Sequence, residues 1–166
     1  SITPNSPFVD VFKTIQQQNL HPGQVSRTTF EGPDGIWIFR LEKQEQTQEM
    51  LLSHTLVCFE GKTRCSDPIP EIEASIKIDT LKKEATPETF ATLEGAEDLG
   101  WATPDRYVDA FALKALATPV GQISDVVESE FGFHLIHKRD ERFVPSYSVK
   151  RILMPLTDEL DIVPQA

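Results

Sequence analysis

The chain has 166 residues, of which 39% are hydrophobic, and carries a formal net charge of −10 at pH 7. This length suits one ordinary domain with partial neighbours, and the hydrophobic share is enough for a packed core. The acidic balance argues against a nucleic-acid partner. No apolar run approaches the roughly 18 residues of a membrane span, so we expect no membrane insertion. The start at Ser1, without a signal-like segment, fits a processed chain or a fragment.

The first third of the sequence predicts one helix and two strands. Apolar residues at helical spacing begin at Phe8, and strong turn chemistry, Gly-Pro-Asp-Gly, follows further on. The helix is expected at residues 8–18 and the strands at residues 24–30 and 36–42. The acidic residues from Glu42 to Glu49 are expected to form a solvated linker.

The remaining elements alternate between strands and helices. They are expected at residues 51–59 (strand), 68–83 (helix), 86–93 (short helix), 98–101 (strand), 103–116 (helix), 121–139 (hairpin) and 148–156 (strand). The helix at 68–83 carries two apolar rows, one with Ile72 and Ile76 and one with Ala74 and Ile78, which predicts packing on two sides. The acidic tail from Thr157 shows no clear element.

A histidine stands next to the Gly-centred turn of the predicted hairpin. His134 follows Gly132 by two residues, within an apolar strand. Such a histidine either carries a functional proton or is a core residue with a hydrogen-bonded ring. Pairing with His137 in a metal site is not expected, because residues three apart on a strand point to opposite faces. The two tryptophans, Trp37 and Trp101, are expected in the core.

The two cysteines, Cys58 and Cys65, lie on either side of a polar loop. They are compatible with a disulfide in an oxidising compartment or with two free thiols, and these alternatives stay open. Half of a metal site is a weaker alternative, because no histidine lies near them in the sequence.

The sequence repeats itself at a spacing of about 97 to 99 residues. The matching segments are residues 8–12 with 107–111, 23–26 with 121–124, 35–39 with 132–136, and, more weakly, 53–57 with 150–154. We therefore expect the C-terminal half of one degenerate unit at 1–46, a complete unit at 47–144, and the start of a further unit or a tail at 145–166. In the flanking copies Trp37 replaces His134 and Arg151 replaces His54, so chemistry that needs both histidines belongs to the middle unit.

Five short motifs follow one another across residues 49–142. They are Ser-His-Thr-Leu-Val from Ser53, Asp-Leu-Gly-Trp from Asp98, residues 107–111, Gly-Gln-Ile-Ser from Gly121, and Phe-Gly-Phe-His-Leu-Ile from Phe131. In this order they resemble the parvulin peptidyl-prolyl isomerases, and in particular the tandem parvulin units of SurA-type envelope chaperones. The motifs are specific as a set although each alone is weak.

The resemblance implies an α+β fold, in which helices surround a four-stranded antiparallel sheet whose first and last strands are adjacent and central. It implies a catalytic site in which His54 faces His134, with Ser129 hydrogen-bonded to the pair. The proline pocket that it implies is formed by Leu99, Tyr107, Phe111 and Phe131. The family usually has a longer loop before Asp98, which supplies an acidic or cysteine residue. Here Asp98 or Glu94 is expected to stand in, a departure that bears on catalytic rate more than on fold.

Three functional interpretations follow. The first is a peptidyl-prolyl cis-trans isomerase and folding chaperone that acts on Pro-containing segments of unfolded proteins in the cell envelope or periplasm, without a cofactor. The second is a non-catalytic module that binds extended client or partner peptides. The third is structural: the two flanking half-units combine, within one chain or between chains, into a split module.

Overall fold

The computed structural model describes residues 1–155, which divide into two compact units. Unit 2 is Thr47–Phe143, and unit 1 combines Ser1–Gln46 with the residues from Val144 onward. The predicted tail from Thr157, and with it the end of the expected 145–166 segment, lies outside the described residues. No helix within the described part of the chain is long and apolar enough to cross a membrane.

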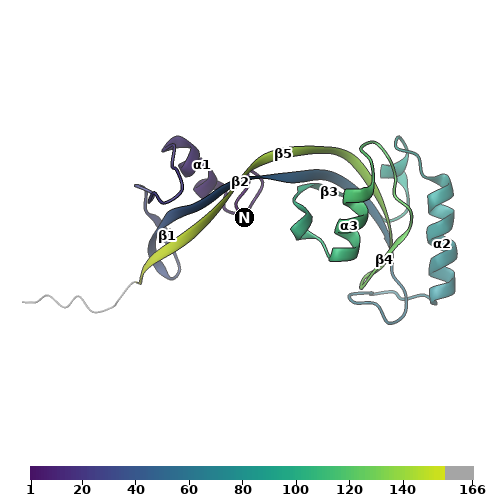
Figure 1. The fold of residues 1–166 in the computed structure, drawn as a ribbon. Coiled ribbons are helices and arrows are strands. Elements are labelled where there is room, and N and C mark those ends of the chain that lie inside the picture. The colour runs from purple at the N-terminus through teal and green to yellow at the C-terminus, as the bar shows by residue number, and fades with distance from the viewer. Residues whose placement is uncertain (156–166) are drawn as a thin grey trace, which may run out of the picture. The chain divides into compact units, whose positions relative to one another are not determined.

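The fold is α+β with helices packed on an antiparallel sheet, as predicted, and the described residues contain three α-helices (Figure 1). The stretch expected as a short helix at 86–93 contains only one 3-10 turn. The helices are α1 (Val9–Gln17), α2 (Glu71–Glu84) and α3 (Asp109–Ala117), and single 3-10 turns are η1 (Phe90–Thr92) and η2 (Pro104–Arg106). The strands are β1 (Phe30–Gly32), β2 (Gly35–Val57), β3 (Ala96–Ala102), β4 (Val127–Ser129) and β5 (Gly132–Pro155). The long strands β2 and β5 each contribute residues to both units.

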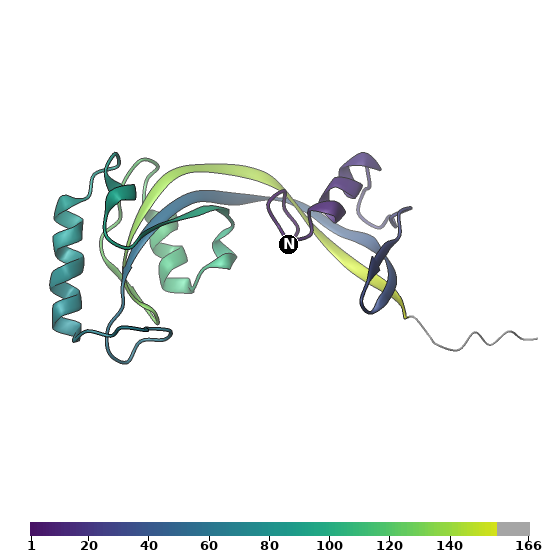
Figure 2. The same ribbon diagram turned by 180° about the vertical axis from the view of Figure 1, so that it is seen from behind.

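In unit 2, β2 and β5 are the central neighbours, with β3 beside β2 and β4 beside β5. Successive residues of β5 point to opposite faces of the sheet and bury against different helices. Leu135 packs with Ile78 and Leu81 of α2, whereas Ile136 packs with Phe111 of α3. Figure 2 shows the strands of unit 2 passing between α2 and α3. The sheet therefore holds two separate hydrophobic clusters, one on each face.

Helix α2 buries only one of its two apolar rows. Ala74 and Ile78 are buried, whereas Ile72 and Ile76 are 70% and 63% exposed. The prediction of packing on two sides is wrong for this unit. The reason is that the sheet offers α2 a single surface.

Two other expectations from the sequence are corrected by the paired strands. The residues expected as a linker from Glu42 to Glu49 lie within β2, and Glu49 itself is completely buried with its carboxylate bonded to Arg142 at 2.8 Å. The expected strand at 24–30 is reduced to β1 and a single bridge between Val25 and Arg40. Pairing along β2 and β5 thus overrides the low strand propensity of the Gln- and Glu-rich segment.

Cys58 and Cys65 form a disulfide directly after β2, which decides between the alternatives left open above. The loop that it closes contacts the turn after β4. The Thr63 backbone N–H donates to the Glu130 carbonyl at 2.8 Å, and Lys62 Nζ donates to the Ser129 carbonyl at 3.0 Å.

Unit 1 is built around α1, which buries Val11, Phe12 and Ile15. This face packs against Phe39 of β2 and Tyr147 of β5 in one hydrophobic cluster. Strand β1 pairs antiparallel with the start of β2. The segment after Val144 therefore packs with the first 46 residues in the same unit.

Candidate active site

Two histidines meet on the neighbouring strands β2 and β5 of unit 2. The Nδ1 atoms of His54 and His134 lie 3.2 Å apart. Their rings are nearly parallel, with an interplanar angle of 20° and centroids 5.5 Å apart. His134 is buried, and the side chain of His54 is 13% exposed. The structure thus brings together the two histidines that the motifs single out.

The histidine pair is part of a chain of four polar side chains. Ser129 Oγ lies 2.6 Å from His134 Nε2, and Glu97 Oε2 lies 3.4 Å from His54 Nε2. An ionised carboxylate only accepts hydrogen bonds, so His54 Nε2 carries a proton and donates it to Glu97. His54 Nδ1 then accepts from His134 Nδ1–H, and His134 Nε2 accepts from the Ser129 hydroxyl. Glu97 thereby sets one direction of donation along the four side chains.

The turn before His134 requires a glycine. Gly132 has φ of +140°, and a Cβ there would lie 2.4 Å from the Val57 carbonyl oxygen and 2.8 Å from the Cys58 Cα. Both the backbone conformation and the close approach exclude a side chain. This contact brings the start of β5 against the end of β2, beside the two histidines.

Burial makes His134 a weak base. Desolvation, and then the neighbouring His54, lower the pKa of His134 to about 4. The imidazole is therefore neutral at physiological pH, which agrees with the direction of donation from Ser129. A neutral ring orients and hydrogen-bonds but supplies no positive charge to the site.

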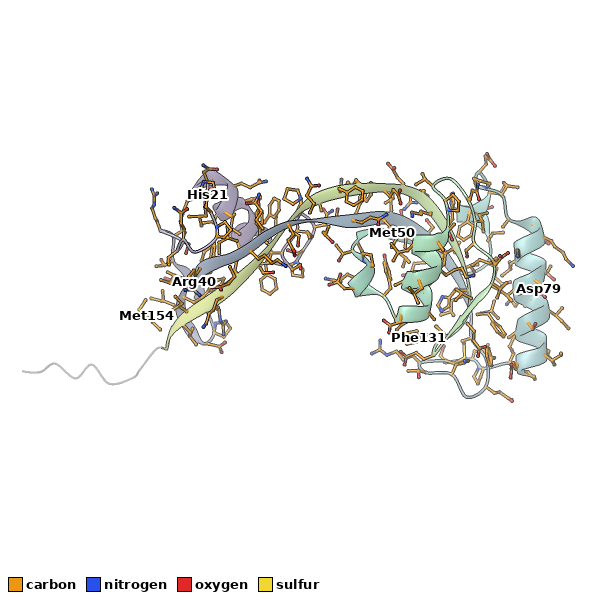
Figure 3. All side chains as sticks on the ribbon, in the orientation of Figure 1. His21, Arg40, Met50, Asp79, Phe131 and Met154 are labelled. Carbon is orange, nitrogen blue, oxygen red and sulfur yellow. A yellow bond between two sulfur atoms is a disulfide. The ribbon has the colours of Figure 1, made fainter. Side chains whose placement is uncertain are left out.

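An apolar cavity of about 260 Å³ opens beside the histidines. It is lined by His54, Leu99, Arg106, Tyr107, Val108, Phe111, Phe131 and His134. Phe111 presents its ring edge-on to His134, with centroids 5.2 Å apart. Figure 3 labels Phe131, which follows β4 at this end of the unit. Among the described residues, the buried hydroxyl of Tyr107 has no hydrogen-bond partner.

Asp98, expected from the sequence as a catalytic carboxylate, is not beside the histidines. Across the β2–β3 ladder, His54 pairs with Glu97 and Ser53 pairs with Asp98. Neighbouring residues of a strand face opposite sides, so Glu97 shares the face of His54 and Asp98 does not. Asp98 instead accepts from the Gly100 N–H and from Arg139, which lower the pKa of its carboxyl. Glu94, the other expected substitute, forms an ion pair with Lys77 at 2.7 Å.

A separate cavity of about 220 Å³ contains Asp98, together with His137 and Arg139. His134 and His137 therefore line different cavities, as their spacing predicts. Within residues 1–155, no group of acidic, histidine and cysteine side chains is arranged to hold a metal ion. Motif matching missed Glu97, Arg106 and Val108 at the histidine site, and only the strand register identifies Glu97.

The family model of the PPIC-type PPIase domain, a peptidyl-prolyl isomerase domain, matches residues 36–142. Because this match covers more than half of the chain, the protein belongs to that family. The matched stretch contains both histidines, Ser129 and Glu97.

Curated relatives are bacterial chaperones of the SurA type. The chain is 30% identical over 149 residues to the chaperone SurA of Burkholderia thailandensis, a match that covers 80% of this chain and 32% of that protein. It is 42% identical over 65 residues to the chaperone SurA of Yersinia pestis, covering 39% of this chain and 15% of that protein. The chain thus spans about a third or less of these relatives.

Among solved structures, the PPIase domain of TBPAR42 aligns with 55% of this chain and 99% of its own, at 22% identity and a TM-score of 0.48.

Proposed function

We propose that unit 2 is a peptidyl-prolyl cis-trans isomerase that acts on Pro-containing segments of unfolded proteins. The observation that carries the proposal is the hydrogen-bonded pair of His54 and His134 at one wall of an apolar cavity. The cavity is of a size for one proline ring with its flanking peptide groups.

The chemistry needs no nucleophile. Rotation about a peptide bond is opposed by amide resonance, with a barrier of roughly 18 to 20 kcal/mol. The planar amide is the more charge-separated form. An apolar cavity that binds the proline ring away from water therefore favours the twisted amide more than water does. Leu99, Tyr107 and Phe111 supply the apolar walls.

The polar side chains then have an orienting role. The His54–His134 pair holds one face of the cavity in place through Ser129 and Glu97. The buried Tyr107 hydroxyl, which has no partner among the described residues, can donate to a carbonyl of the bound peptide. Burial also raises the pKa of Tyr107, so this hydroxyl stays protonated.

The Cys58–Cys65 disulfide supports a location in the bacterial envelope or periplasm, because disulfides persist in oxidising compartments. The SurA-type relatives support the same location. We propose that the clients of this chain are unfolded polypeptides. We propose no cofactor.

A second candidate function is a client-binding module without turnover. It is favoured by the acidic residue of the site, because Glu97 is 71% exposed and lies 3.4 Å from His54, which makes a long and weak hydrogen bond. Such a site binds a peptide without polarising its prolyl amide.

The test is cis-trans exchange of a short Ala-Pro peptide, followed by NMR in the presence of the whole chain. We expect acceleration over buffer, and its loss in the His54→Ala, His134→Ala double variant. His21→Ala serves as the matched control, because His21 is an exposed histidine of unit 1. Absence of acceleration at high protein concentration, with peptide binding retained, would replace the isomerase by the binding module.

A further inference from the structure

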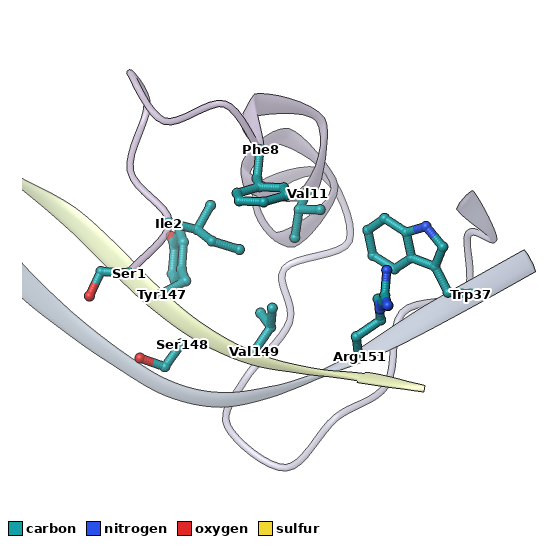
Figure 4. Close-up of a pocket in the computed structure, with 9 residues that line it drawn as sticks. All are labelled: Ser1, Ile2, Phe8, Val11, Trp37, Tyr147, Ser148, Val149 and Arg151. Atoms are coloured by element: carbon teal, nitrogen blue, oxygen red, sulfur yellow. The ribbon is translucent and has the colours of Figure 1, made fainter. Parts of the chain in front are cut away.

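Unit 1 contains a second apolar cavity, of about 520 Å³ (Figure 4). Its lining comes mainly from three elements. Phe8 directly precedes α1 and Val11 lies on it, Trp37 lies on β2, and Tyr147, Val149 and Arg151 lie on β5. Figure 4 shows the Arg151 side chain directed toward the indole of Trp37. The guanidinium carbon lies 5.9 Å from the centre of that ring. An aromatic wall and a cation thus meet at one cavity.

The backbone around this cavity repeats that of the histidine site. The Gly23 N–H donates to the Leu41 carbonyl at 2.7 Å, as the Gly121 N–H does to the Lys138 carbonyl at 2.7 Å. The Ser26 N–H donates to the Phe39 carbonyl at 2.8 Å, as the Ser124 N–H does to the Ile136 carbonyl at 2.8 Å. In each unit the serine hydroxyl also accepts from the backbone N–H of the strand residue that its own N–H contacts. Ser26 Oγ accepts from Phe39, and Ser124 Oγ accepts from Ile136.

The segment after Val144 continues this correspondence. Ile2 bridges Tyr147 in the antiparallel sense, as Ala102 pairs with Met50 in unit 2. The residues that follow also match, because Ile-Thr-Pro-Asn from Ile2 repeats Ala-Thr-Pro-Asp from Ala102. In each copy the threonine carbonyl accepts a backbone N–H from three residues further on, at 3.1 Å.

This correspondence assigns the lining residues to positions of the histidine site. Trp37 stands where His134 stands, Arg151 stands where His54 stands, and Phe8 stands where Tyr107 stands. The cavity of unit 1 is therefore at the place where unit 2 has its proline cavity. It keeps an aromatic ring at the Tyr107 position, as Phe8, whereas Asp34 stands at the position of Phe131. It exchanges the imidazole pair for an indole and a guanidinium.

We infer that the cavity of unit 1 is a second peptide-binding site, which holds an extended segment with a proline next to an aspartate or glutamate. The proline ring packs against Trp37 and Phe8, and the neighbouring carboxylate binds Arg151. This site holds its peptide without isomerising it, because the histidine pair is replaced. The inference goes beyond the proposed function and does not require the histidine site to be active.

The charge at the cavity points to an acidic ligand. Arg151 is the charged side chain among those drawn in Figure 4, and a guanidinium binds a carboxylate in a bidentate geometry. Its present partner, Asp34, lies 3.9 Å away, and the two side chains are 51% and 66% exposed. Such an exposed pair is weak, so a carboxylate of the bound segment can replace it.

The experiment measures Trp37 emission in the full chain. The chain has two tryptophans, so Trp101→Phe leaves Trp37 as the single reporter and keeps a ring under Arg142. Two peptides are titrated, identical except that one has Glu and the other Lys beside the proline. We expect the Glu peptide to shift the Trp37 emission and to bind at least tenfold more tightly than the Lys peptide.

Two variants of opposite sign make the result specific. Arg151→Gln is expected to weaken binding of the Glu peptide about five- to tenfold, because one exposed charge-assisted contact is lost. Asp34→Asn is expected to strengthen it, because the competing carboxylate is removed. Both positions are exposed, and circular dichroism checks that the variants fold.

Equal binding of the two peptides, or Trp37 emission that stays constant at saturating peptide, would overturn the inference. So would an affinity that is unchanged in Arg151→Gln. The two proposals fail in different measurements. Failure of the proposed function appears as absent exchange catalysis, whereas failure of this inference appears in the Trp37 titration. The His54→Ala, His134→Ala variant is expected to lose exchange catalysis and to keep the Trp37 titration of the parent chain.

Discussion

Glu97 lies directly opposite His54 across the β2–β3 ladder, with Oε2 3.4 Å from His54 Nε2. This contact gives the site its acidic member and fixes the direction of donation from Ser129 through both rings. Glu97→Gln removes the charge that sets this direction. We expect a two- to fivefold loss in the rate of prolyl exchange, because one long hydrogen bond to a largely exposed carboxylate is weakened.

The competing carboxylates give the comparison. Asp98→Asn and Glu94→Gln remove acidic groups that bond to Arg139 and to Lys77 rather than to a histidine. Exchange rates of the three variants, measured side by side, show which carboxylate contributes to the rate. A greater loss in Asp98→Asn, with unchanged unfolding, would contradict the assignment of Glu97.

The buried His134 predicts a loss of stability in acid. Its pKa of about 4 lies below the ordinary value of 6.5, so the unfolded chain binds this proton more tightly than the folded chain. The free energy of unfolding therefore falls as the pH falls from about 6.5 to about 4, by an amount on the order of 3 kcal/mol. Above pH 6.5 the ring is neutral in both states and the contribution is constant.

The measurement compares urea unfolding of the parent chain and of His134→Gln at pH 7.5 and pH 4.5. The parent is expected to lose more stability between the two pH values. His137, whose pKa is also lowered by burial, contributes with the same sign in both proteins, so the difference isolates His134. Identical losses in the two proteins would show that His134 does not titrate in this window.

Gly132 is predicted to be the least replaceable glycine of unit 2. In Gly132→Ala the new Cβ would meet the Val57 carbonyl at 2.4 Å, so we expect a loss on the order of 3 to 5 kcal/mol. Gly121→Ala is the matched control, with positive φ but no atom within 4 Å, and about 1 to 2 kcal/mol is expected there. Thermal unfolding followed by circular dichroism compares the two, and similar midpoints would refute the close-approach argument.

The Cys58–Cys65 disulfide is expected to stabilise unit 2 by about 2 to 3 kcal/mol, because it closes a short loop in the unfolded chain. The loop also contacts the turn of Ser129 through Lys62. Urea unfolding with and without reductant measures the effect, and the Cys58→Ser, Cys65→Ser variant should be insensitive to reductant. A parent chain that is equally stable in both conditions would contradict this prediction.

Sequence motifs predicted the part of the site that depends on residue type and order. His54, His134 and Ser129 stand in short motifs, and the structure places them in one hydrogen-bonded chain. The predicted pocket residues Leu99, Tyr107, Phe111 and Phe131 line one cavity with the histidines. Their roles in binding and catalysis remain predictions.

The acidic member was missed because its position depends on strand register. The β2–β3 ladder shifts register between Leu52 and Ser53, and a shift of one residue exchanges the two faces of a strand. Composition cannot show such a bulge, so Asp98 and Glu97 were not distinguishable. The burial of Glu49 was likewise invisible, because Arg142, its partner, is 93 residues away in the sequence.

The central claim is that the cavity beside His54 and His134 receives the proline of a client. The most direct measurement is a ¹⁵N–¹H NMR titration of the whole chain with an unlabelled Ala-Pro peptide. The account predicts saturable shifts at Tyr107, Phe111 and Phe131, which disappear in the His54→Ala, His134→Ala variant. If peptide exchange is still accelerated but the signals of these three residues do not move, the active site lies elsewhere and the account is contradicted.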